Sequence, residues 1–155
     1  MYIMKELSEL EKKINVVFND KNLLLQAVVH DSYINENPGF KPGHNERLEF
    51  LGDAVLELVV REFLYDKFPN PEGDLTKYKE QLVKNDRLPI ISNKLNLEDY
   101  LLMGKGEYNN KAGRQKLLAD TLEALIGAIY LDQGYKKVRD FITNNILNDC
   151  KKILK

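Results

Sequence analysis

Apolar residues recur with the 3.6-residue period of an α-helix along nearly the whole chain, and no segment alternates strictly between apolar and polar residues. This pattern predicts an all-α protein, because a half-buried strand would need a period of two. The length of 155 residues suits one domain, and the sequence contains no internal repeat and no obvious domain boundary. We therefore expect residues 1–155 to form a single helical domain.

Clusters of Pro, Gly and Asn divide this pattern into helices and loops. The expected helices cover residues 7–14, 20–34, about 46–68, a stretch starting at 75, a stretch starting near Pro89, 115–133, and 136–154. Asp20 or Asn22 is available as an N-cap, and Gly134 is placed to end the 115–133 helix. Two longer loops are expected at 35–45 and 104–114.

One predicted helix carries acidic residues within an apolar sequence, NERLEFLGDAVLELVV, which spans residues 45–60. Glu46, Glu49 and Asp53 stand at i, i+3 and i+7, so their side chains share one stripe of the helix. Burying an unpaired carboxylate costs on the order of several kcal/mol of folding free energy, so such a group usually takes up a proton instead. The stripe therefore needs a partner that compensates its charge.

A second apolar helix repeats this feature, with Asp120 and Glu123 at i, i+3 in LLADTLEALIGAIYL. If the two helices pack side by side, the carboxylates converge and repel one another. The spacing leaves two explanations open: a bound cation, or structural ion pairs with Arg47, Arg61 or Lys116. For a cation, hard oxygen ligands with few histidines favour Mg²⁺ or Mn²⁺ over zinc. Such a site can activate a water and stabilise the leaving oxygen of a phosphodiester.

Composition excludes several other classes of protein. The net charge of −1 gives the molecule no basic footprint, which argues mildly against a dedicated nucleic-acid binder. The single Cys150 excludes an internal disulfide framework and a multi-cysteine zinc site. The N-terminus lacks the apolar core of a signal peptide, and the most apolar run is too short to cross a bilayer. We expect a cytoplasmic protein without membrane contact.

The motifs resemble, in their order, the catalytic domain of the ribonuclease III family of double-stranded RNA endonucleases. The resemblance rests on HNERLEFLGDAVLELVV and LADTLEALIGAIYLDQGY, joined by LLLQAVVHDSYINE, EFLYDKFPNPEGDLTKYKEQLV and GKGE. It extends from about Leu10 to Ile146. It implies an all-helical domain that dimerises through the signature helix (about 46–68). It also implies a Mg²⁺-dependent endoribonuclease, with Mn²⁺ as a substitute, acting on double-stranded RNA such as ribosomal RNA precursors and leaving 5′-phosphates and short 3′ overhangs.

The resemblance also assigns roles to individual residues. By position, Glu49, Asp53, Asp120 and Glu123 match the metal ligands of the family, and Asp53 and Glu123 the catalytic acids. Glu46 and Glu72 match supporting acids of the cleavage valley, and Phe50 matches an aromatic residue that enters a pocket on the partner of a homodimer. The residues themselves leave alternatives open. Glu46 can complement the helix dipole, and Glu72, expected in a loop after Pro71, can be a solvated or capping acid.

The loop GKGEYNNKAGRQK is locally cationic in a nearly neutral protein. Lys105, Lys111, Arg114 and Lys116 are candidates for contacts with RNA phosphates, and a solvated loop explains them equally well. This loop is also shorter before LAD than in relatives, so its geometry is expected to differ.

Family members usually carry a double-stranded-RNA-binding domain after the catalytic domain, whereas this sequence ends at Lys155. Whether the protein is naturally this short is open, and we expect weak, strongly salt-sensitive affinity for duplex RNA. The alternative function is a catalytically weak or inactive RNA-binding or ribosome-associated structural module of the same fold. Such a module would be expected to have lost one or more of the acids, and all are present here.

Overall fold

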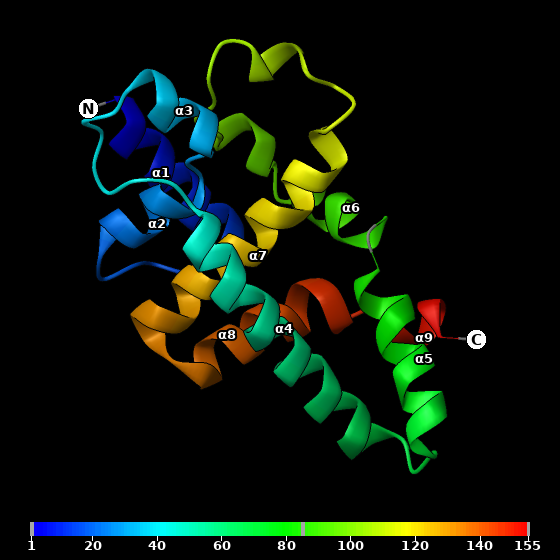
Figure 1. Cartoon of the computed structure of the whole chain (residues 1–155). Coiled ribbons are helices and arrows are strands. Elements are labelled where there is room, and N and C mark those ends of the chain that lie inside the picture. Colours follow the sequence, from blue (N-terminus) through cyan, green and yellow to red (C-terminus); the bar gives the residue numbers. More distant parts are fainter. Residues whose placement is uncertain (1, 85, 155) are drawn as a thin grey trace.

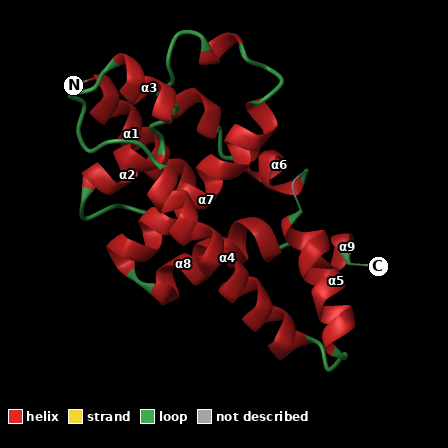
Figure 2. Cartoon of the chain, viewed as in Figure 1, coloured by secondary structure: helices red, strands yellow, loops and turns green. Residues whose placement is uncertain are grey.

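The computed structural model describes residues 2–84 and 86–154, which form helices joined by loops (Figure 1, Figure 2). The α-helices are α1 (Tyr2–Ile14), α2 (Lys21–Ala27), α3 (Asp31–Glu36), α4 (Glu46–Lys67), α5 (Glu72–Val83), α6 (Arg87–Lys94), α7 (Arg114–Gln133), α8 (Tyr135–Ile142) and α9 (Cys150–Ile153). Within the described residues the only β-type pairing is an isolated bridge between Val29 and Leu102. The predicted all-α class is confirmed.

The two acidic helices, α4 and α7, pack against each other at the centre of the molecule (Figure 1). α7 is buried along most of its length, and α2, α6 and α8 pack around it. Leu122, Leu125 and Ile126 of α7 have no exposed surface. Because the apolar residues of α7 face neighbours on several sides, this helix forms the middle of the core rather than one of its walls.

Two glycines let α4 and α7 approach closely. A Cβ atom added at Gly52 of α4 would overlap the backbone carbonyl of Glu123, and one added at Gly127 of α7 would overlap the carbonyl of Leu48. The backbones therefore touch at this crossing, with no side chain between them. Since Glu49 and Asp53 flank one glycine and Glu123 precedes the other, the crossing determines which acids meet.

The predicted helix 20–34 is wrong, because the chain breaks after Ala27 and starts again at Asp31. Asp20 caps α2 as expected, accepting a hydrogen bond from the backbone of Asn22 at 2.9 Å. Between the helices the chain turns at Val28 and is extended at His30, and this segment pairs with Leu102 through two hydrogen bonds of 2.9 Å. The β-branched Val29 suits the bridge position between them, and the His30 side chain then caps α3.

Other boundaries also differ from the prediction. The first helix begins at Tyr2 rather than at residue 7. The predicted helix 136–154 is interrupted by a π-helical turn at Thr143–Leu147, where the buried Arg87 donates to the Ile146 carbonyl at 2.7 Å. This contact takes a carbonyl that a continuous helix would need. Glu72 is the first residue of α5, not a loop residue.

The ends of the two central helices agree with the sequence prediction. α4 stops at Lys67 with Phe68 as its C-cap, and Gly134 ends α7 with a φ of 86°. None of the described helices combines the length and the apolar character needed to cross a membrane.

Candidate active site

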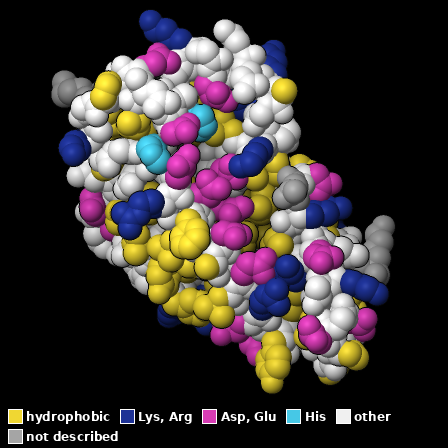
Figure 3. Space-filling view, viewed as in Figure 1, with side chains coloured by type: hydrophobic (Ala, Val, Ile, Leu, Met, Phe, Trp, Pro, Cys, Tyr) yellow, Lys and Arg dark blue, Asp and Glu magenta, His cyan; other side chains and the backbone are white. Residues whose placement is uncertain are grey.

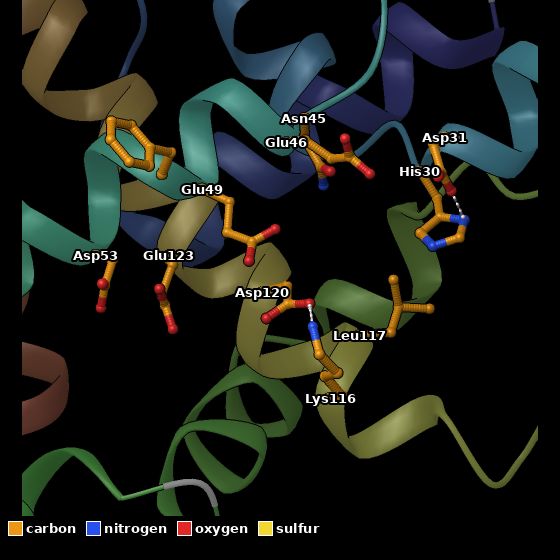
Figure 4. Close-up of a pocket in the computed structure, with 11 residues that line it drawn as sticks. His30, Asp31, Asn45, Glu46, Glu49, Asp53, Lys116, Leu117, Asp120 and Glu123 are labelled. Carbon is orange, nitrogen blue, oxygen red and sulfur yellow. Dashed lines mark hydrogen bonds and ion pairs between the residues drawn. The ribbon is translucent and has the colours of Figure 1, made fainter.

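The predicted acids gather at one cavity of about 470 Å³ between α4 and α7 (Figure 4). Its lining includes Glu46, Glu49, Asp53, Asp120 and Glu123, together with His30, Asp31, Asn45, Phe50, Lys116 and Leu117. Figure 3 shows the acidic side chains as a band across this face of the molecule. The structure thus brings together five of the six acids that the sequence singled out.

The carboxyl groups in this cavity lie close enough to change one another's protonation. Burial, followed by the charges of Asp53, Asp120 and Glu49, raises the pKa of Glu123 to about 8. Burial, followed by the charge of Asp120, raises the pKa of Glu49 to about 7. Groups shifted this far upward indicate an excess of negative charge held in a partly dry site.

Lys116 supplies a positive charge at the edge of this cluster. Its Nζ lies 2.6 Å from Oδ2 of Asp120, one turn further along α7 (Figure 4). This contact raises the pKa of Lys116, and the charges of Glu49 and Glu123 raise it further. Of the ion pairs considered for the two stripes, the structure contains this one. Arg61 instead pairs with Glu57, at 2.9 Å.

The residues of this cavity fit a hard divalent cation in their chemistry. Five carboxylates from α4 and α7 line the cavity, and the ammonium group of Lys116 is paired with one of them, that of Asp120. As the side chains stand, no three Asp, Glu, His or Cys residues in the described part of the chain are arranged as a ready-made metal site. The carboxyl groups instead interact in pairs, Glu49 with Asp120 and Glu123 with Asp53. Their helix positions are fixed by the glycine crossing, and their side chains can rotate.

The rim of the cavity is formed by the turn before α3 and the start of α4. His30 Nδ1 accepts a hydrogen bond from the backbone of Ser32 at 3.2 Å and lies 3.2 Å from Oδ1 of Asp31. The buried Asn45 donates to the Ala27 carbonyl at 3.0 Å and ties the start of α4 to this turn. The ring of His30 thus serves as the N-cap of α3. The break that places His30 at the cavity was not predicted.

A second depression of about 310 Å³ continues from the acids along the other side of Asp53 and Glu123. Glu57, Lys79 and Lys84 line it, and Lys79 Nζ lies 3.4 Å from Oε1 of Glu57. Helical spacing did not predict that Lys79 and Lys84 lie beside the acids. Lys79 belongs to α5 and Lys84 is its C-cap, and only the packing of α5 on α4 reveals their position.

The positively charged residues of the 104–114 loop have different surroundings in the structure. Lys105 and Lys111 are exposed to solvent. Arg114 instead forms an ion pair with Glu98 and donates to the carbonyls of Glu107 and Tyr108, at 3.1 and 3.2 Å. Its guanidinium therefore holds the loop to the body of the protein. Contact with RNA phosphates stays a prediction for all of them.

Glu72 lies apart from the other acids. It is exposed in the first turn of α5, beyond the C-terminal end of α4. Glu49 and Lys67 of α4 are 18 residues apart in sequence, which corresponds to about 27 Å of helix. Within one chain, the described structure does not bring Glu72 to the acidic cavity, and its supporting role stays a prediction.

Phe50 projects from α4 at the edge of the acidic cavity. Its side chain is 85% exposed, although it belongs to a helix of the core. Beside it lies an apolar cavity of about 610 Å³, lined in part by Leu23, Leu51 and Leu131. Figure 3 shows the resulting apolar patch next to the acidic band. An exposed aromatic residue adjacent to an apolar hollow is typical of a protein–protein contact.

With this geometry in place, comparisons with known proteins identify the family. A family model described as ribonuclease-III-like matches residues 20–150. The chain belongs to this family. Ribonuclease 3 of Enterococcus faecalis is 47% identical over 141 residues, which cover 90% of this chain and 61% of that protein. Ribonuclease 3 of Natranaerobius thermophilus is 50% identical over 141 residues, which cover 89% of this chain and 60% of that protein.

A solved structure supports the same assignment. The chain is similar to the nuclease domain of ribonuclease III from Campylobacter jejuni, with a TM-score of 0.81 and 43% identity, covering 90% of this chain and 94% of that one. A region involved in dimer formation of that nuclease domain shows structural flexibility. The chain spans about 60% of the length of the curated relatives it matches. The family resemblance stated from the motifs is thereby confirmed.

Proposed function

We propose that this chain is a Mg²⁺-dependent endonuclease domain that hydrolyses phosphodiester bonds of double-stranded RNA, leaving 5′-phosphates and short 3′ overhangs. The observation that carries the proposal is the convergence of Glu49, Asp53, Asp120 and Glu123 on one cavity. Ribosomal RNA and other structured precursors are the substrates we expect, in the cytoplasm. Family membership and the ribonuclease 3 relatives support this proposal.

In this proposal the four acids would hold the cation, and Asp53 and Glu123 would act as the catalytic acids. When bound there, Mg²⁺ would supply a Lewis acid for the phosphodiester and lower the pKa of the attacking water, and Mn²⁺ could replace it. Burial of Glu123 and the close approach of α4 to α7 keep these carboxylates in place before substrate arrives. Glu46, at the rim, adds negative charge that strengthens cation binding.

We further propose that the domain acts as a homodimer through the patch around Phe50. A two-fold contact would let Phe50 of each copy enter the apolar cavity beside Phe50 of the other. Dimerisation would place two acidic cavities on one duplex, so that each cuts one strand. The exposed Lys105 and Lys111 are candidates for contacts with phosphates flanking the cut.

The test is a cleavage assay on a long RNA duplex at low salt. Wild-type protein should yield short duplex products with Mg²⁺, no products with EDTA, and no cleavage of single-stranded RNA of the same sequence. Exchange of Lys105 or Lys111 for Gln should weaken duplex binding and lower the salt dependence by about one unit of slope each.

The opposite result would be intact duplex RNA at every Mg²⁺ concentration from protein shown to be a folded dimer. That outcome would favour the alternative, a structural RNA-binding module in which the acids no longer catalyse. A binding measurement on the same protein separates the two explanations of failure. If the duplex binds and stays intact, catalysis is absent; if it does not bind, this domain alone cannot hold its substrate.

A further inference from the structure

One positively charged side chain at the acidic cavity has no assigned role. Among the described residues that line this cavity, Lys116 is the only lysine or arginine. Its Nζ lies 2.6 Å from Oδ2 of Asp120, an acid we assign to the cation (Figure 4). The Asp120 side chain is 23% exposed, whereas that of Lys116 is 80% exposed. The exposed ammonium group of Lys116 is therefore paired with the largely buried carboxylate of Asp120.

The stability of α7 does not explain a lysine at this position. α7 begins at Arg114, so Lys116 stands in its first turn, where the helix dipole favours acidic residues. A basic residue four positions before an acidic one is also the less favourable order for a pair on a helix. An exposed pair of this kind contributes little to stability. The neighbouring acids of α4 are the better reason for the contact.

Two further acids of the same cavity act on Lys116. Glu49 comes from α4, and Glu123 follows Asp120 by one turn of α7, so the ammonium interacts with acids on two helices. A single positive charge there offsets part of the mutual repulsion of the cluster. Lys116 thus supplies the compensating charge that a divalent cation would supply, and it does so at one of the carboxylates assigned to that cation.

We propose that Lys116 is a built-in counter-ion of the acid cluster, which competes with the divalent cation for Asp120 and so sets the cation affinity of the site. The inference rests on the proposed function in that it takes these acids as the cation ligands. Without a cation, the pair stabilises the folded protein. When a cation binds, Nζ has to leave Asp120, and its exposed, flexible side chain can do so without disturbing the core.

The experiment measures Mn²⁺ binding directly, without RNA. Wild-type protein and the variant Lys116→Gln are titrated with Mn²⁺, and free Mn²⁺ is followed by its electron paramagnetic resonance signal. We expect the variant to bind Mn²⁺ about five- to tenfold more tightly, because the competing charge is gone. In EDTA the variant should melt at a lower temperature than the wild type, because its acids repel one another without compensation.

Two further variants serve as controls. Lys111→Gln removes an exposed lysine of the loop before α7 and should bind Mn²⁺ as the wild type does. Lys116→Arg keeps the charge and should retain the weaker wild-type affinity. If Lys116→Arg binds Mn²⁺ as tightly as Lys116→Gln, the charge of Lys116 is not the cause and the inference fails.

The outcomes separate this inference from the proposed function. Equal Mn²⁺ affinity of wild type and Lys116→Gln, or weaker binding by the variant, would overturn the counter-ion role and leave the metal-dependent nuclease standing. Failure of Mn²⁺ to bind either protein would overturn the cation site itself, and with it the proposed function.

Discussion

α4 and α7 have similar sequences in one respect, since each places two of the four central acids within an apolar helix, but their surroundings differ. α7 is enclosed by other helices, and its exposed apolar residues, Tyr130 and Leu131, lie near its C-terminal end. α4 is buried on one side only. Phe50, Leu58 and Tyr65 project from its other side, 85%, 56% and 77% exposed.

The difference shows that one sequence pattern serves two purposes. An apolar helix with an acid stripe can be the centre of a core, as in α7, or a core wall with an unpartnered apolar face, as in α4. The acids meet because both helices present their stripe to the same cavity. The exposed side of α4 is then available for a second copy of the chain, as we propose. The two helices should therefore contribute equally to the acidic site and differ in their other contacts.

The largest effect is expected for exchange of one acid from each helix. Asp53→Asn on α4 and Glu123→Gln on α7 should each slow duplex cleavage about 10³-fold, or ~4 kcal/mol, because each removes a charge that holds the cation at the reacting phosphate. Single-turnover cleavage at saturating protein measures the rate. Asp66→Asn, an exposed acid of α4, should cleave at the wild-type rate. A large loss for only one of the two central acids would show that the helices are not equivalent.

Exchange at the helix crossing should affect stability next most strongly. Gly52→Ala places a Cβ in the backbone carbonyl of Glu123, so α4 and α7 have to separate. We expect a loss of at least ~3 kcal/mol in the free energy of unfolding, measured by urea denaturation. Gly39→Ala, in a loop where a Cβ meets nothing within 4 Å, is the control. Equal stability of the two variants would mean that the close backbone contact does not hold the acids together.

Exchange of the exposed aromatic residue should separate the functions of the two helices. Phe50→Ala is expected to weaken dimerisation by about 2 kcal/mol, roughly 30-fold in the dissociation constant, while the folded monomer stays intact. Sedimentation over a range of protein concentrations measures this constant. Tyr108→Ala, a 51% exposed aromatic residue in the 104–114 loop, should leave it unchanged. A monomeric wild-type protein would contradict the interpretation of the exposed side of α4.

The smallest effect concerns the pH dependence of stability without metal. The pKa of Glu123 is raised from 4.5 to about 8, so the folded carboxyl keeps a proton that the unfolded one releases. The free energy of unfolding should therefore fall as pH rises from about 4.5 to 8. Glu123→Gln removes this contribution and should raise Tm in EDTA at pH 8 by about 2–4 °C, with little change near pH 4.

Thermal melting at the two pH values measures this difference. A variant that melts at the same temperature as the wild type at pH 8 would show that Glu123 is not strained by its neighbours. Saturating Mg²⁺ should reverse the order, because only the wild type retains the complete set of acids.

Helical spacing predicted most of the site, because side chains on one stripe of a regular helix keep their relation in any packing. Glu49 and Asp53 needed only the period of α4, and Asp120 and Glu123 only that of α7. The meeting of the two pairs depended on the glycine crossing, which spacing does not reveal. The family resemblance supplied that link in advance.

Predictions failed where the backbone leaves the helical pattern. Nothing in the apolar run before His30 reveals that Val29 pairs with Leu102, some 70 residues later, and so places His30 at the cavity rim. Arg114 is similar, since its partner Glu98 comes from a different segment of the chain. In both cases the decisive contact is long-range, and local spacing carries no information about it.

The most direct test of the central claim is to locate Mn²⁺ in crystals of the protein by its anomalous scattering. We expect a peak between α4 and α7, within about 2.2 Å of carboxylate oxygens from Glu49, Asp53, Asp120 or Glu123, with Nζ of Lys116 displaced from Asp120. A structure at saturating Mn²⁺ in which the cavity holds no peak and Lys116 still contacts Asp120 would contradict it.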